Sequence, residues 1–436
     1  MAQYSEPLHL GALPPELFDK VFLELHTIRD LASLILTARF AYHGFKVQRQ
    51  TILFRVLQNE LGPALPDARF LFLFPYSKPG DNDWERYWGW ILFMGGVYRD
   101  MLPQNELLPA IGNNAREDPG LPRVEVLTAL CQTLHLINFL TDTYINTQLT
   151  SFDLAGGGNT AATAPLSRPE RQRIMRAFYR RQILSNAWAS TRRPAPYWDE
   201  VDSYVFGNSS TDTDLRLGFL TAFAPWDMQQ IDHADCFITR LCRALVHRAA
   251  GAAEKGRGRE ISPRWFGDLH AHLDKLVRYL RTRERVAEAA LWDLRAGRAP
   301  PDDDRVRIQF VDRYGLVPLS CAWQEDLAVV FPDPQFNREE REGLSLGDFV
   351  RDNPGQLPFG WSDALGGRYV RWYGAALCDI PWLPFWGSIE KEDEHTAAID
   401  LWRFAGFALW DRERVKALKR LGRYEVFQTG FVLDRS

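Results

Sequence analysis

The chain has 436 residues, of which 46% are hydrophobic and 25% are charged, and its formal net charge is −4. This composition is typical of a globular protein and excludes a chain that is disordered throughout. The small negative charge also argues against a protein that binds nucleic acid or an anionic membrane over its whole surface. The length allows two or three domains.

The first residues predict three short helices that form one unit, residues 1–62. Two prolines followed by Glu16 begin the first helix, because proline fits the first turn and an acidic side chain suits the positive end of the helix dipole. Thr27 and Asp30 have the spacing of a capping box for the second helix. The third helix should cover residues 39–61, where a Gly-Pro pair ends it.

The residues of this unit resemble an F-box. The resemblance rests on the patterns Leu13-Pro14-x-Glu16-Leu17 and Asp30-Leu31-x-x-Leu34. An F-box docks onto the Skp-type adaptor of SCF (Skp–cullin–F-box) ubiquitin ligases, so the resemblance implies a link through that adaptor to a cullin ligase. It also implies the residues that bind the adaptor, which are Leu13, Pro14, Glu16, Leu17, Leu31 and Leu34.

A physical argument also leads to a partner. Three short helices cannot bury all of their apolar side chains among themselves. We expect Phe18 and Phe22 to turn toward the third helix of the unit, which leaves Leu13, Leu17 and Leu31 for another protein.

The rest of the chain, residues 63–436, predicts a large irregular helical domain. Apolar residues recur at helical spacing over about 122–149, 225–250 and 262–280. Sustained alternation of apolar and polar residues, the pattern of strands, is not found. We therefore expect an all-α protein in which the N-terminal unit packs on this helical body.

Two glycine-rich segments interrupt the body and are candidate hinges. Residues 155–164 include three consecutive glycines, and residues 251–259 combine glycine with charged side chains. Both predict mobile surface loops, which are preferred sites for proteases.

An arginine-rich helix follows the first of these loops. Ser167 and Glu170 predict its capping box. Pairing of the arginines with acids of neighbouring helices, or exposure to solvent, is the favoured interpretation; an acidic partner and nucleic acid are the alternatives. Between residues 168 and 193 the only acid is Glu170, and the arginines are Arg168, Arg171, Arg173, Arg176, Arg180, Arg181, Arg192 and Arg193.

The C-terminal part is dense in tryptophan, which predicts an aromatic core. Together with the box and the arginine-rich helix, it resembles a large group of fungal F-box-like proteins with helical C-terminal bodies. The tryptophans concerned are Trp361, Trp372, Trp382, Trp386, Trp402 and Trp410.

The metal-ligand residue types do not form a convincing site. His233, Cys236, Cys242 and His247 fall on one predicted helix, but a straight helix cannot turn all four toward one ion. No motif of a known hydrolase or dinucleotide-binding enzyme occurs. We therefore predict a non-catalytic protein without metal or cofactor.

The cysteines and the N-terminus indicate a reducing compartment. The five cysteines are odd in number and scattered, which favours buried thiols over disulfides. No basic segment followed by an apolar run begins the chain, so no signal peptide is expected. The uncharged stretch 126–141 is 16 residues long, too short to span a bilayer. We expect an intracellular protein, cytoplasmic or nuclear, that binds neither membrane nor nucleic acid.

Three interpretations of function follow. In the first, the chain recruits substrates to an SCF-type ligase, with the box on the Skp-type adaptor and the body on a protein target whose identity is unknown. In the second, it is a helical scaffold that recruits no ligase. In the third, it is an enzyme with an unrecognised site in its aromatic C-terminal region.

Overall fold

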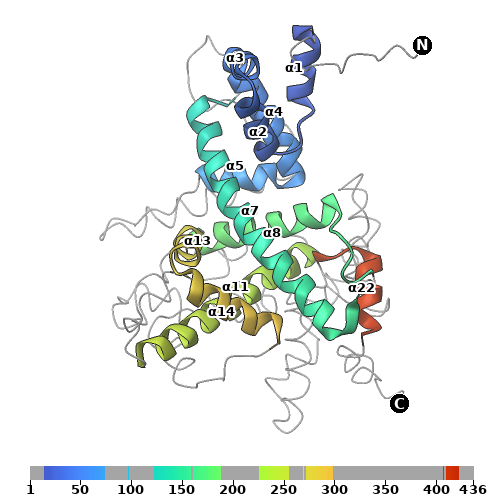
Figure 1. Ribbon diagram of the computed structural model, residues 1–436, viewed down its shortest axis with the longest axis vertical. Coiled ribbons are helices and arrows are strands. Elements are labelled where there is room, and N and C mark those ends of the chain that lie inside the picture. Colours follow the sequence, from blue (N-terminus) through green and yellow to red (C-terminus); the bar gives the residue numbers. More distant parts are fainter. Residues whose placement is uncertain are drawn as a thin grey trace, which may run out of the picture. The chain divides into compact units, whose positions relative to one another are not determined.

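The computed structural model describes residues 14–73, 97, 122–158, 161–187, 225–254, 269, 272–297, 406 and 409–421 (Figure 1). These residues are 86% helical and include no strand, which confirms the prediction of an all-α protein for this part of the chain. Their contacts divide the chain into two units. Unit 1 comprises residues 1–73 and 101–135, and unit 2 comprises residues 74–100 and 136–436.

Unit 1 extends beyond the boundary predicted at residue 62. Its helices are α1 (Pro15–Leu23), α2 (Ile28–Thr37), α3 (Arg39–Val47), α4 (Arg49–Leu61) and α5 (Leu65–Leu73). A 3-10 turn, Gly62–Ala64, joins the last two. Helix α7 (Val124–Phe152) begins in unit 1 and continues in unit 2.

The predicted third helix is divided into α3 and α4. Gln48 leaves the helical conformation, with φ −116° and ψ 27°. Its side-chain amide donates a hydrogen bond to Asp19 of α1 at 2.6 Å. The break gives α3 a direction of its own, and Gly44 then lies against Phe18 and Phe22.

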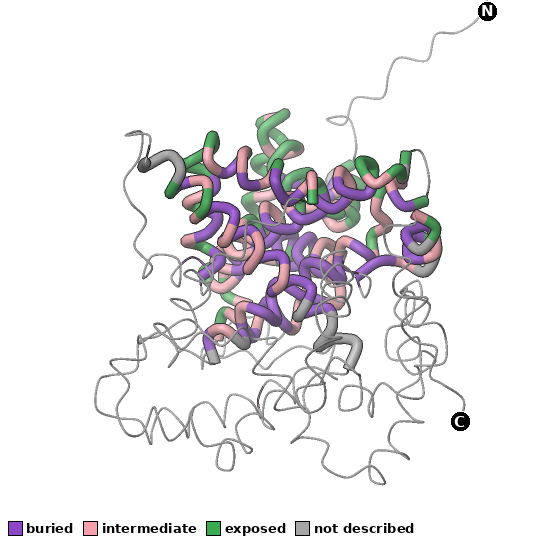
Figure 2. Tube along the Cα trace, turned by 90° about the horizontal axis from the view of Figure 1, so that it is seen from below, coloured by how far each residue is buried: buried purple, intermediate pink, exposed green. Residues whose placement is uncertain are grey.

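Helix α4 forms the centre of unit 1. Its side chains Ile52, Val56, Leu57 and Leu61 are fully buried, and the purple segments of Figure 2 show where burial is greatest. Polar side chains of the same helix fix the turn between α1 and α2. Asn59 donates to the carbonyl oxygens of Leu23 and Leu25 at 2.9 Å, and Glu60 accepts from the Ile28 amide at 2.7 Å.

The predicted capping box of α2 is confirmed. The Asp30 amide donates to the Thr27 hydroxyl at 3.0 Å, and the hydroxyl donates in turn to the Asp30 carboxylate at 2.7 Å. The helix therefore begins where the sequence places it.

Unit 2 is built around helix α11, which packs against α8 and α14. The helices of this unit, apart from the second half of α7, are α8 (Arg168–Ala187), α11 (Pro225–Glu254), α13 (Leu273–Thr282), α14 (Glu284–Arg295) and α22 (Arg412–Lys419). The aromatic core predicted for the C-terminal part is represented by Trp410, which is fully buried. The other five tryptophans of that cluster lie outside the described residues.

The core of unit 2 joins aromatic rings from four segments. Tyr144 stacks on Trp410 with ring centroids 5.8 Å apart, and Phe237 meets Tyr144 edge-on at 5.0 Å. Gly406 approaches the same tyrosine with φ +73°, and a Cβ atom there would lie 1.9 Å from the Tyr144 hydroxyl. Only glycine fits this position without movement of its neighbours.

The structure describes only part of each candidate hinge. Residues 251–254 are the end of α11, and residues 255–259 lie outside the described part. In the first hinge, Ala162 is fully buried, and the carbonyl groups that follow are held by an arginine described below. The backbone of residues 161–164 is therefore held by hydrogen bonds, and the hinge at residues 155–164 remains a prediction.

Candidate functional site

The six residues predicted to bind an adaptor have different surroundings. Pro14 and Glu16 are exposed, and Leu17 keeps 47% of its surface accessible. Leu34 is half-buried. Leu13 lies outside the described residues.

Leu31 does not lie on the surface as expected. Only 2% of it is exposed, because α2 packs against α3 and α4 and turns this side chain inward. The expectation that Leu31 is left for a partner is therefore wrong, and the residue belongs to the core of unit 1.

Helix α1 separates a buried face from an exposed one. The Pro14 carbonyl accepts the amides of Leu17 and Phe18 at 3.0 Å, which fixes the first turn. Phe18 and Phe22 are buried and meet edge-on with centroids 4.8 Å apart, as the sequence predicts. Leu17 lies on the other side of the helix and remains accessible.

Exposed apolar side chains are concentrated in unit 1. Of the eight large hydrophobic residues exposed in the described part of the chain, six belong to this unit. Among them the sequence predicts only Leu17. It indicates one helix in place of α3 and α4, which hides the exposure of the three residues on α3. The six are Leu17, Leu36, Phe40, Tyr42, Val47 and Phe72. Accessible apolar groups at this density are typical of a protein-binding surface.

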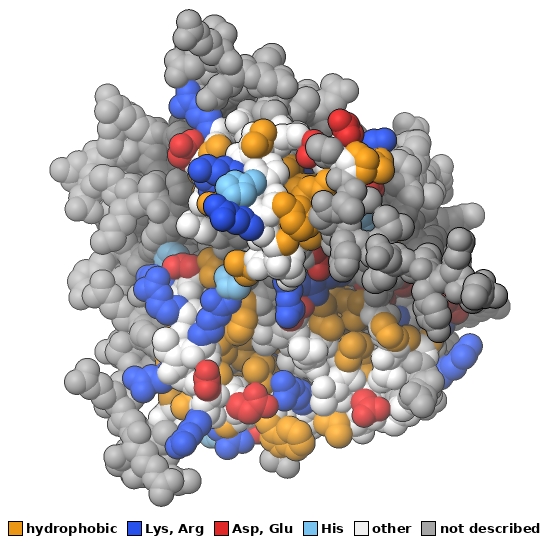
Figure 3. Space-filling view, turned by 45° about the horizontal axis from the view of Figure 1, so that its top comes forward, with side chains coloured by type: hydrophobic (Ala, Val, Ile, Leu, Met, Phe, Trp, Pro, Cys, Tyr) orange, Lys and Arg blue, Asp and Glu red, His pale blue; other side chains and the backbone are white. Residues whose placement is uncertain are grey.

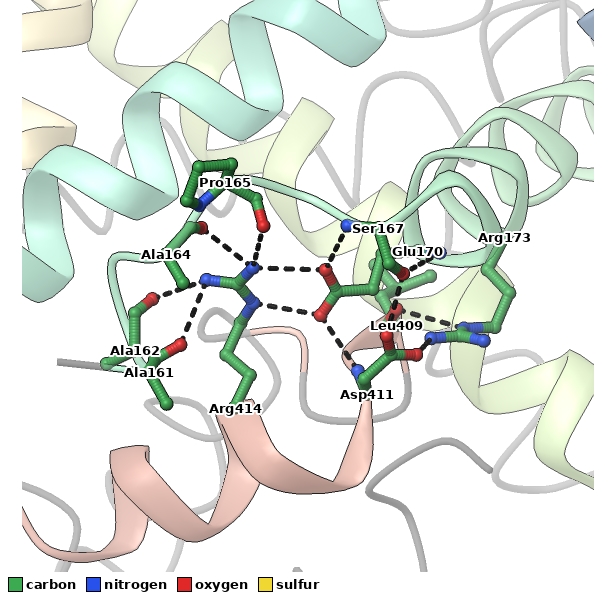
Figure 4. A network of polar contacts seen from close by, with 10 residues as sticks. All are labelled: Ala161, Ala162, Ala164, Pro165, Ser167, Glu170, Arg173, Leu409, Asp411 and Arg414. Carbon is green, nitrogen blue, oxygen red and sulfur yellow. Dashed lines mark hydrogen bonds and ion pairs between the residues drawn. The ribbon is translucent and has the colours of Figure 1, made fainter. Parts of the chain in front are cut away.

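Unit 2 contains a second notable arrangement, a polar cluster centred on Glu170 at the start of α8 (Figure 4). The Glu170 carboxylate accepts hydrogen bonds from Arg414 Nε at 2.8 Å and Nη2 at 3.0 Å. It also accepts from the backbone amides of Asp411 at 2.9 Å and Ser167 at 3.0 Å. The last contact and the Glu170 amide, which donates to the Ser167 hydroxyl at 3.2 Å, confirm the predicted capping box.

Arg414 also reaches the segment before α8. Its guanidinium donates to the carbonyl oxygens of Ala162 at 2.7 Å and Ala164 at 2.9 Å, with longer contacts to Ala161 and Pro165. On the other side, Arg173 pairs with Asp411 and donates to the Leu409 carbonyl at 3.1 Å. The cluster thus joins residues 161–165, helix α8 and the segment 409–414.

Electrostatics favour the charged form of Glu170 in this cluster. Burial alone would raise the pKa of Glu170, but hydrogen bonds from Arg414 and its positive charge, helped by the two amides, hold that pKa below its ordinary value. Burial lowers the pKa of Arg173, and the charge of Asp411 opposes this effect. Because donors and acceptors satisfy one another, the arrangement stabilises the fold of unit 2.

Three arginines of α8 form ion pairs with acidic residues of the same chain. Arg173 pairs with Asp411, and Arg181 Nε lies 2.9 Å from Asp235 Oδ1 in the core. Arg171 pairs with Asp142 at 2.6 Å. For these three the interpretation as intramolecular pairs is confirmed, whereas Arg192 and Arg193 lie outside the described residues.

The thiols and histidines of the described helices do not form a reactive or metal-binding group. Burial raises the pKa of Cys242 to about 12, and burial with the charge of Glu60 raises that of Cys131 to about 11, so both are protonated at neutral pH. Among the residues that the structure places, no three or more histidine, cysteine or acidic side chains converge as metal ligands.

One helix in the described part, Val124–Gly156, is long and apolar enough to cross a membrane by length and composition. It is longer than the stretch considered from the sequence. A core helix of a soluble protein meets the same criteria. In the most apolar window of this helix, 33% of the residues are buried inside the protein.

Comparison with protein-family models, with curated proteins and with solved structures gave no match for this chain. Its function is therefore argued from the residues themselves.

Proposed function

We propose that the chain is a substrate-recruiting adaptor of an SCF-type ubiquitin ligase, in which unit 1 docks on a Skp-type adaptor and the helical body binds a protein target. One observation carries the proposal: the exposed apolar side chains of the described residues are concentrated on the small N-terminal unit. The resemblance of its opening residues to an F-box supplies the identity of the partner.

The start of α1 is the centre of the proposed contact. Pro14 and Leu17 are accessible, and Glu16 beside them is exposed. A standard protein interface buries about 1,600 Å² in total, and a few central residues supply most of its binding energy. Leu36 at the end of α2 is a further exposed apolar side chain of the same unit.

The test is a binding measurement between the purified full chain and a purified Skp-type adaptor. Replacement of Pro14 and Leu17 together by alanine should weaken binding by about 2 kcal/mol, roughly thirtyfold. The melting temperature should change little, because both side chains are accessible. Calorimetric titration gives the first quantity and circular dichroism the second.

Leu154→Ala is the matched control, because Leu154 is also an exposed leucine, 55% accessible, but belongs to unit 2. It should bind the adaptor like the wild type. If the wild type does not bind, or if the double variant binds equally well, the ligase assignment fails and the helical scaffold is the interpretation that remains.

A further inference from the structure

The stretch that contains α3 has an unusual distribution of charge. From Leu31 to Asn59 the chain has no acidic residue, although the whole protein is acidic. The same stretch contains four permanent cations and one histidine, which are Arg39, Lys46, Arg49, Arg55 and His43. A local excess of positive charge therefore lies on a unit whose apolar surface is already exposed.

Helical geometry gathers several of these groups on one face of α3. Arg39, His43 and Lys46 are spaced i, i+4 and i+7, so they form one stripe along the helix. All three are exposed, and the Arg39 Nε donates to the His43 Nε2 at 3.4 Å. The opposite side of the helix carries Ala41, which is fully buried.

Apolar side chains border the basic stripe on both sides. Phe40 and Val47 are spaced i and i+7 and are 41% and 84% exposed. Tyr42 borders the other edge and is 49% exposed. Figure 3 shows basic and histidine side chains gathered beside hydrophobic ones on unit 1. We call Arg39, Phe40, Tyr42, His43, Lys46 and Val47 the α3 face.

The cations of this face are not neutralised within the described part of the chain. Neither Arg39 nor Lys46 forms an ion pair with any residue that the structure places, in contrast to the arginines of α8. Both cations remain in water and are free to attract an acidic group. The exposed apolar side chains beside them are the kind of surface that marks an interaction site.

We infer that the α3 face is a second binding surface, and that its partner is an acidic helical segment of another protein. Carboxylates along the centre of such a helix would meet the basic stripe, and apolar residues on its flanks would meet Phe40, Val47 and Tyr42. This surface lies on α3, whereas the adaptor contact is proposed at the start of α1, and its basic stripe plays no part in that contact.

The arrangement of cations and apolar side chains on the α3 face favours a protein partner over a membrane. A helix that lies on a bilayer needs a continuous apolar face that inserts below the headgroups. Here Arg39 and Lys46 lie between the apolar side chains, so insertion of both flanks would also bury the cations. Helix α3 has only nine residues, about 13 Å, which is short for tracking a nucleic-acid backbone.

The experiment uses the full chain and a fluorescent 18-residue peptide, designed with glutamates on one helical stripe and leucines on both flanks. A peptide with lysines in place of the glutamates is the comparison. The wild type should bind the glutamate peptide at least tenfold more tightly in fluorescence anisotropy. Arg39→Glu with Lys46→Glu should weaken that binding at least tenfold.

Arg55→Glu is the control for net charge, because Arg55 is an exposed arginine of the same acid-free stretch but lies on α4. It should bind the glutamate peptide within about twofold of wild type. Equal losses in the control and in the double variant, or no loss in the double variant, would overturn the inference. So would failure of the wild type to bind the peptide, or tighter binding to phosphatidylserine vesicles than to the peptide. Adaptor affinity, measured separately on the same variants, shows whether the α1 contact persists.

Discussion

Helices α3 and α8 are both rich in basic residues, but their counter-charges lie in different places. In α8, Arg173 and Arg181 are buried and paired with Asp411 and Asp235 of distant segments. In α3, Arg39 and Lys46 are exposed, and no acid among the described residues pairs with them. The positive charge of α8 is thus used to assemble unit 2, whereas that of α3 is available at the surface of unit 1.

The comparison shows that the number of basic residues in a helix does not decide whether the helix binds a partner. The sequence favoured pairing of the α8 arginines inside the protein or exposure to solvent, and left an acidic partner as an alternative. Burial decides the matter instead, because a buried guanidinium must find its counter-charge inside the protein. A shorter and less charged helix is the better candidate when its cations remain in water.

The largest effect should follow from removal of Arg414. Arg414→Ala leaves the buried carboxylate of Glu170 without its counter-charge and frees several carbonyl groups, so the free energy of unfolding should fall by about 3–5 kcal/mol. Urea unfolding followed by tryptophan fluorescence measures this, since Trp410 is buried beside the cluster. Arg171→Ala is the control, because its pair with Asp142 is partly exposed and should contribute at most about 1 kcal/mol. Similar losses in both variants would erase the contrast between buried and exposed pairs.

A smaller effect should appear in how the free energy of unfolding depends on pH. The pKa of Glu170 in the folded protein lies below its value in the unfolded chain, about 4.3. Its contribution to stability is therefore complete above about pH 4.3 and is lost as the pH falls through the lower, folded pKa. Glu170→Gln cannot titrate, so its stability should depend less on pH in this acidic range.

The measurement is a series of urea titrations of wild type and Glu170→Gln between pH 2 and 7. The difference in free energy of unfolding should be on the order of 1–3 kcal/mol at neutral pH and should shrink in acid. A difference that stays constant with pH would show that the Glu170 charge is not what holds the cluster.

The smallest effect on stability belongs to α3. Charge reversal of Arg39 and Lys46 together should change the free energy of unfolding by no more than about 0.5 kcal/mol, because both side chains are exposed and make no ion pair with a described residue. Arg173→Glu would put two carboxylates together in the α8 cluster and should destabilise the protein severely. Thermal unfolding of the two variants tests the contrast directly.

Local features were predictable because their causes are local. The capping boxes at Thr27 and Ser167 involve residues three positions apart, and both form as the sequence indicates. The inward face of α1 also follows from the spacing of Phe18 and Phe22. The all-α class follows from the same periodicity.

Features that depend on residues far apart in the sequence could not be predicted from local spacing. The break at Gln48 is accompanied by a bond to Asp19, 29 positions away. Leu31 has the same apolar character as Leu17, and only the packing of α2 decides that one is buried and the other accessible. The anchoring of residues 161–165 depends on Arg414, about 250 positions later, which no local pattern reveals.

The distance in sequence between Glu170 and Arg414 also has a consequence for biosynthesis. Their contact spans 244 positions, and the aromatic core of unit 2 needs Trp410 as well. During translation the core of unit 2 therefore cannot close over Tyr144 and Phe152 until residues 410–414 have left the ribosome. All residues of unit 1 precede residue 136, so this unit is synthesised well before residues 410–414. A nascent chain interrupted shortly before residue 409 would lack Trp410, Asp411 and Arg414, and would leave the aromatic core of unit 2 uncovered and prone to aggregate.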